Sequence, residues 1–145
     1  MSAAQVAYDC AVLCEDVRQE ITQKSFLIGV ISSELLLQAF PSVISICIYS
    51  EGTVIEAGEF QSRIKAIDDV GNILFNGALG VSYNFIEGRF SQADRLQLTV
   101  QREGVISFIA IDGSSKEQTL LKRQVKLVPI SDPRDDVATM LGIPP

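Results

Sequence analysis

The fold class of this chain is decided by residues 60–66, which read Phe-Gln-Ser-Arg-Ile-Lys-Ala. Three long polar side chains, those of Gln61, Arg63 and Lys65, alternate here with side chains that are apolar or small. Because successive side chains of a β-strand point to opposite faces of the sheet, the alternation predicts a strand with one solvent-exposed face and one buried face.

The same kind of signal recurs on both sides of this stretch. Residues 105–111 are apolar on both faces, as expected of a central strand. The other strand-like runs are residues 26–31, 43–49, 81–85, 96–100 and 120–128. Turn signals separate the runs at roughly eight to twelve residues, the spacing of sandwiches and small barrels. We therefore expect an all-β fold, a two-layer antiparallel β-sandwich of about seven to nine strands.

Short polar pairs predict where the chain turns. Gly71-Asn72 and Asn76-Gly77 are both typical of tight turns. Glu103-Gly104 links two strand-like runs and predicts a hairpin of residues 96–100 with residues 105–111. Asp112-Gly113 predicts the turn that leads into the last strand.

Residues 3–20 carry two conflicting patterns. Val6, Cys10, Leu13 and Val17 recur at helical spacing, and Ser2 is a suitable N-cap for such a helix. The same stretch also alternates as a strand would. Periodicity alone favours the helix slightly, so an α+β fold with an N-terminal helix at residues 3–20 is the alternative.

Composition excludes several classes of function. The chain has 145 residues, which fits one domain, and 47% of them are hydrophobic, enough for a real core. A formal net charge of −6 would repel a phosphate backbone, so we expect no nucleic-acid partner. The absence of His removes the commonest general base and excludes the usual Ser-His-Asp and Cys-His systems.

The sequence also predicts the cellular location of the protein and the limits of its domain. No apolar stretch approaches the roughly 18 residues of a membrane helix, and no secretory signal is visible, so we expect a cytoplasmic protein with no membrane partner. We expect residues 1–129 to form the sandwich domain. Residues 130–145 differ in character and are expected to be a C-terminal tail, either loosely ordered or acting as a docking segment.

Part of the chain resembles a known family. Residues 13–18 read Leu-Cys-Glu-Asp-Val-Arg, and Lys24, the Leu-Ile-Gly-Val of residues 27–30 and Phe40-Pro41 follow. This pattern is similar to that of a family of short, uncharacterised bacterial proteins, in which Asp is commoner at the position of Glu15. The resemblance implies that residues 8–14 form the first strand rather than a helix, and it implies no activity.

The candidate binding residues are five charged side chains. Glu15, Asp16 and Arg18 form a charged end to the first element, which we expect to lie in a loop that serves as a recognition patch or is simply solvated. Asp16 together with Asp68 and Asp69 would offer oxygen ligands to a calcium ion, although Asp before a Gly-Asn turn is also favoured for turn geometry alone.

The cysteines do not predict a metal centre. Cys10, Cys14 and Cys47 are three thiols without any imidazole, too few for a zinc site, and an odd number gives no disulfide framework. Cys10 and Cys14 are best interpreted as two small apolar core residues. We assign no catalytic residue, no metal and no cofactor.

Function is therefore predicted largely by elimination. The leading hypothesis is a non-enzymatic binding or assembly module that acts on a protein partner or on a second copy of itself. One alternative is a hydrolase or ligand-responsive domain that uses carboxylates and Arg18, which a deep pocket with Asp16, Arg18 and a buried carboxylate would favour. Another is a structural component of a larger bacterial or phage assembly.

Overall fold

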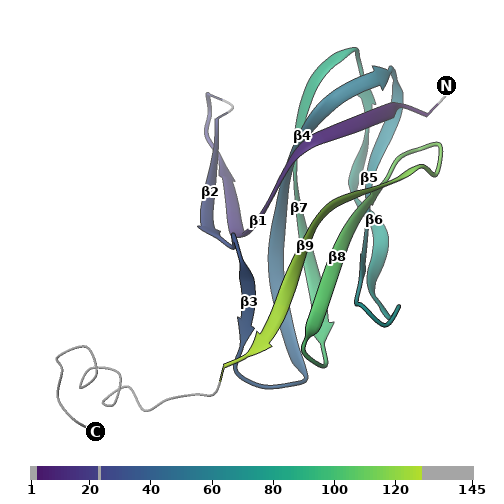
Figure 1. Ribbon diagram of the computed structural model, residues 1–145. Helices are drawn as coiled ribbons and strands as arrows, with labels where there is room; N and C mark the ends of the chain where they lie inside the picture. The colour runs from purple at the N-terminus through teal and green to yellow at the C-terminus, as the bar shows by residue number, and fades with distance from the viewer. Residues whose placement is uncertain (1–2, 23, 129–145) are drawn as a thin grey trace, which may run out of the picture.

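The computed structural model describes residues 3–22 and 24–128, and every regular element in this part of the chain is a β-strand (Figure 1). The tail predicted at residues 130–145 lies outside the described residues. The strands are β1 (Gln5–Gln19), β2 (Ser25–Val30), β3 (Glu34–Leu37), β4 (Ser42–Glu56), β5 (Gly58–Ile67), β6 (Ile73–Phe85), β7 (Gly88–Val100), β8 (Gly104–Ile111) and β9 (Glu117–Leu127).

The strands form two sheets, which confirms the predicted sandwich. The four-stranded sheet has the order β2-β1-β4-β7, and the five-stranded sheet has the order β3-β9-β8-β5-β6. Neighbouring strands are antiparallel except β3 and β9, which are parallel. The run that is apolar on both faces, β8, lies at the centre of the five-stranded sheet, as its sequence predicts.

The alternative of a helix at residues 3–20 is wrong, because residues 5–19 form β1. The pairing of β1 with β4 shifts register between Tyr8 and Cys10. Before the shift Val6 is buried, and after it Leu13 is buried, so the inward face changes from even to odd positions. A β-bulge of this kind breaks the period of two and leaves apolar residues at apparent helical spacing.

Two of the turn predictions are also wrong. Asn76 and Gly77 lie inside β6, where they pair with Lys65 and Ile64 of β5. The residues predicted as a hairpin around Glu103-Gly104 belong to β7 and β8, which lie in different sheets. In both cases pairing with distant strands overrides a local turn preference. The turns at Gly71-Asn72 and Asp112-Gly113 are present; the Gly71 amide donates to the Asp68 carbonyl at 3.2 Å.

The core lies between the two sheets and is built from their inward faces. Its largest fully buried side chains include Phe60, Phe108, Leu13 and Ile48. A second cluster around Phe60 adds stacked and tilted rings, with the Phe60 and Phe85 centroids 4.5 Å apart. Within the described chain there is no helix long and apolar enough to cross a membrane.

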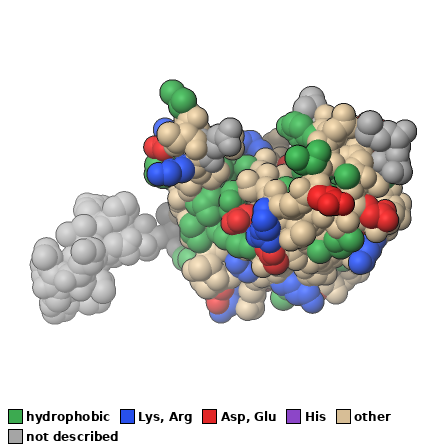
Figure 2. Space-filling view, turned by 90° about the horizontal axis from the view of Figure 1, so that it is seen from above, with side chains coloured by type: hydrophobic (Ala, Val, Ile, Leu, Met, Phe, Trp, Pro, Cys, Tyr) green, Lys and Arg blue, Asp and Glu red, His purple; other side chains and the backbone are tan. Residues whose placement is uncertain are grey.

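One hairpin extends away from this core. The second half of β1 pairs with β2 from Cys14–Val30 to Gln19–Ser25. We call residues 15–30 the arm. Figure 1 shows it projecting to one side of the sandwich, and in Figure 2 its side chains stand apart from the main body.

Candidate functional site

The charged residues of the arm lie in a strand and not in the predicted loop. Asp16 receives a hydrogen bond from the Arg95 guanidinium of β7 at 2.6 Å, and its Oδ2 lies 3.7 Å from Nε of Arg18. A hydrogen bond from the Val17 amide, followed by the bond from Arg95, holds the pKa of Asp16 below its usual value. The side chain of Glu15 lies over Gly29, where a Cβ atom would come within 2.7 Å of Cδ.

Asp68 and Asp69 lie in a separate place, in the turn between β5 and β6. Asp69 accepts a hydrogen bond from Arg102 at 2.6 Å. The Asp68 side chain accepts from Asn72 and from the Val70 amide. Although desolvation acts in the opposite direction, these hydrogen bonds lower the pKa of Asp68.

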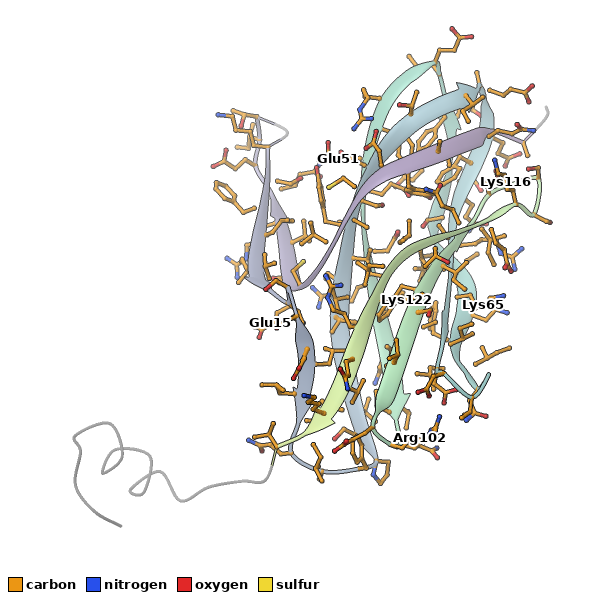
Figure 3. All side chains as sticks on the ribbon, viewed as in Figure 1. Glu15, Glu51, Lys65, Arg102, Lys116 and Lys122 are labelled. Atoms are coloured by element: carbon orange, nitrogen blue, oxygen red, sulfur yellow. The ribbon has the colours of Figure 1, made fainter. Side chains whose placement is uncertain are left out.

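The structure therefore divides the five candidates into two groups. Asp16 of the first group pairs with Arg95, and both members of the second group pair with Arg102. Residues 95–100 of β7 alone span about 17 Å along the strand. Figure 3 shows Glu15 near the base of the arm and Arg102 at the bottom of the sandwich, next to the start of β8. The described residues contain no group of three or more Cys, Asp or Glu side chains placed to hold a metal, so the calcium site is not formed.

A row of exposed apolar side chains runs along the arm. Phe26, Ile28 and Val30 of β2 are 52%, 40% and 53% exposed. They occupy alternate positions and so share one face, and Ile21 in the turn at the tip is fully exposed. We call Phe26, Ile28 and Val30 the apolar row. Large side chains exposed together in this way mark interaction surfaces more often than isolated exposed residues do.

A buried carboxylate is the feature that sequence reasoning missed. Asp94 of β7 is only 9% exposed, and the Ser62 hydroxyl of β5 donates to its Oδ2 at 2.7 Å. Burial raises the pKa of Asp94. The signal was present, because the alternation that assigns Leu96 and Leu98 to the core continues back to Asp94 on the same face.

Asp94 lines a hollow of about 620 Å³. The hollow lies beside β7, the edge strand of the four-stranded sheet, and contains neither Asp16 nor Arg18. Its lining residues are Val17, Gln19, Ser25, Tyr49, Ser62, Leu79, Tyr83, Phe85, Ser91, Gln92, Ala93, Asp94 and Arg95.

A second, smaller hollow of about 380 Å³ lies where β5 turns into β6. It is lined by Asp68 and Asn72 on one side and by Arg102 and Glu103 on the other. The carboxylate of Asp68 is already bonded within the turn, and Arg102 is already paired with Asp69. These groups serve to hold the turn against the start of β8.

The cysteines are split between surface and interior. Cys14 and Cys47 are buried and face each other across β1 and β4, whereas Cys10 is exposed. The Cys14 thiol lies 3.6 Å from the Cys47 carbonyl oxygen. Burial, followed by the neighbouring Cys47, raises the pKa of Cys14. The interpretation as a core residue is therefore confirmed for Cys14 and wrong for Cys10, which the bulge in β1 leaves at the surface.

Comparison with known proteins adds only weak similarity. No family model and no curated protein matches the chain. A β-glucosidase from Erythrobacter marinus matches with a TM-score of 0.43 and 10% identity over 85% of this chain and 16% of that one. A β-glucosidase from Listeria innocua in complex with glucose matches with a TM-score of 0.45 and 9% identity over 88% and 17%. The chain thus spans less than a fifth of the length of these proteins.

Proposed function

We propose that the protein is a non-enzymatic assembly module whose arm binds the arm of a second copy. The observation that carries this proposal is the apolar row, which no other part of the described chain covers although the arm projects into solvent. Burying such side chains between two copies would release water from their surfaces, at about 25 cal/mol for each Å² of apolar area.

Electrostatics favours a second copy at this surface. The charged side chains near the apolar row include Glu15, Asp16, Arg18 and Arg95, whose formal charges cancel. The whole chain carries −6, so two copies repel each other over most of their surface and least at this face. A two-fold axis would also bring acidic and basic groups of the two arms opposite each other.

The backbone geometry favours packing of faces over addition of a strand. Gly29 has φ of +65°, a left-handed conformation that interrupts the regular edge of β2. An interrupted edge is a poor template for a further strand. The apolar row remains intact on both sides of Gly29, so the two arms would pack side chain against side chain.

The expected dimer is weak and reversible. The face of a six-residue strand is smaller than the roughly 800 Å² per partner that a stable interface buries. In sedimentation velocity over a micromolar to near-millimolar range, we expect the average mass to rise from monomer towards dimer. The substitution Ile28→Lys should abolish the rise, because a charge would be placed in the centre of the interface.

The matched control is Val70→Lys, since Val70 is 60% exposed but lies in the turn between β5 and β6. This variant gains the same charge and should associate as the natural protein does. A natural protein that stays monomeric throughout, or an Ile28→Lys variant that still dimerises, would contradict the proposal.

We propose a bacterial cytoplasm as the setting. The support is the resemblance of residues 13–30 to a bacterial family and the state of the thiols, since the three cysteines are unbridged and Cys10 is exposed. A reducing compartment keeps such thiols free. Self-association through the arm is also compatible with a structural place in a larger bacterial or phage assembly.

The hydrolase alternative has less support. The hollow beside β7 has one carboxylate in its lining, and neither Asp16 nor Arg18 reaches it. Carboxylate-based hydrolysis commonly uses two carboxyl groups across the scissile bond.

A further inference from the structure

The hollow beside β7 has the size and position of a small-molecule site. Its volume of about 620 Å³ lies within the range of roughly 300–1,000 Å³ that such sites occupy. It is bordered by β6 and β7, which are edge strands of different sheets and are therefore not joined to each other by a ladder of hydrogen bonds. A ligand can enter a sandwich at such an open flank without displacing a strand.

The polar groups on the inward face of β7 are hydrogen-bond acceptors that the described residues satisfy only in part. Asp94 accepts from Ser62 alone among the described residues, and no Lys or Arg of the described ion pairs reaches it. Two positions away on the same face, Oε1 of Gln92 is buried without a partner. Buried acceptors are normally satisfied, so this pair indicates a missing donor.

The remaining walls are suited to a cation. The rings of Tyr83 and Phe85 line the hollow with their centroids 6.5 Å apart, and Leu79 lies on the same strand. Aromatic faces attract cations, and an apolar wall excludes the water that would otherwise screen the carboxylate.

The one basic residue of the lining does not supply the missing charge. Arg95 is the chain neighbour of Asp94, so its side chain leaves the opposite face of β7. Its guanidinium is 2.6 Å from Asp16 of the arm. Arg95 thus pairs with Asp16, and Asp94 has no cationic partner among the described residues.

We infer that the hollow beside β7 is a binding site for a small organic cation of the amine or amidine class, with Asp94 as its counter-ion. The cation would donate hydrogen bonds to Asp94 and, with a second N–H group, to the amide oxygen of Gln92. The apolar part of the ligand would lie against Tyr83 and Phe85. Val17, Gln19 and Ser25 of the arm line one wall of this site. Its occupation does not require a second copy of the chain.

The test uses two probes of nearly the same shape, cationic benzamidine and neutral benzamide. In titrations of the isotope-labelled protein followed by NMR, we expect benzamidine to shift the amide signals of Ser62, Leu79, Tyr83 and Asp94 in a saturable manner. Benzamide at the same concentrations should leave them in place, because it carries no charge to pair with the carboxylate.

Two variants with the same change in charge complete the experiment. Asp94→Asn should weaken benzamidine binding about tenfold or more, since it replaces a charge-assisted hydrogen bond by a neutral one. Asp69→Asn, which removes an exposed carboxylate outside the hollow, should leave the affinity unchanged. Equal binding of the two probes, shifts that map elsewhere, or shifts that do not saturate would overturn the inference, and the probe comparison needs no variant to fold.

Discussion

Asp94 is the residue at which burial and charge conflict most strongly. An ionised carboxylate removed from water is costly unless it is paired, and Ser62 supplies a single neutral hydrogen bond. The opposite case is Asp16, which is only half-buried, accepts hydrogen bonds from Arg95 and from the Val17 amide, and so favours its ionised form. The two carboxylates therefore respond to pH in opposite directions.

The first prediction concerns the pH dependence of stability through Asp94. Because the pKa of Asp94 is raised in the folded state, its contribution to stability is present at low pH and is lost as pH rises through the folded pKa. In denaturant unfolding from pH 4 to pH 8, we expect Asp94→Asn to gain free energy of unfolding relative to the natural protein as pH increases.

Asn can retain the bond from Ser62, so the comparison isolates the charge. Tyr8 does not interfere, because burial, followed by Asp94 and Asp112, raises its pKa well above this range. A difference between the two proteins that stays constant with pH would show that Asp94 is not desolvated as the structure describes.

At the scale of the element, β1 shows how a β-bulge can hide the alternating pattern of a strand in the sequence. The bulge next to Cys10 changes which positions of β1 face inward. Beyond the bulge, in the arm, one face of β1 is turned towards the sandwich and the other towards solvent. Opposite the bulge, Gly52 of β4 pairs with Tyr8. A Cβ atom at Gly52 would lie 2.2 Å from the Ala7 carbonyl oxygen and 2.8 Å from the Phe90 ring.

The second prediction is that Gly52→Ala destabilises the protein by about 1–3 kcal/mol, because a backbone oxygen cannot move aside as a side chain can. Gly77→Ala is the control, since its nearest neighbour would be the Phe75 ring at an ordinary 3.5 Å. In a strand interior, Gly→Ala should leave the free energy of unfolding unchanged or raise it by roughly 0.5 kcal/mol. Equal losses for both variants, measured by chemical denaturation, would refute the close approach at Gly52.

At the scale of the whole molecule, the two sheets are joined by more than apolar contact. The side-chain amide of Gln118 in β9 donates to the Tyr8 carbonyl at 2.7 Å and accepts from the Tyr8 amide at 3.0 Å. It thus takes the place of a missing neighbour strand for part of β1. Arg123, also in β9, donates to the Ile31 carbonyl near the base of the arm.

The third prediction follows from this bridge. Gln118→Ala should lower the free energy of unfolding by about 1–3 kcal/mol, because it leaves a partly buried amide and carbonyl of β1 without partners. Gln124→Ala on the exposed side of the same strand should change stability by less than about 0.5 kcal/mol. If hydrogen exchange of the Tyr8 amide is unchanged in Gln118→Ala, the bridge does not form in solution.

The strands could be predicted because alternation is a local property of a chain that buries one face of each strand. Residues 60–66 show it without interruption, whereas residues 105–111 are apolar on both faces; both stretches occupy inner strands of one sheet. Sequence could also have identified Asp94, since it continues the alternation of Leu96 and Leu98. Which neighbour Asp94 meets could not be inferred, because Ser62 lies 32 residues away in the other sheet.

The sequence by itself thus determined the class of the fold and the positions of most strands. The tertiary structure alone decided the partner of each strand. For this reason β7 and β8 lie in different sheets, and Asn76-Gly77 lies inside β6 and does not form a turn. It also decided that the charged residues of the arm meet Arg95 and that Asp94 stands without a cation. The physical reason is range: side-chain alternation is set by adjacent residues, whereas pairing and burial depend on residues brought together only when the two sheets pack.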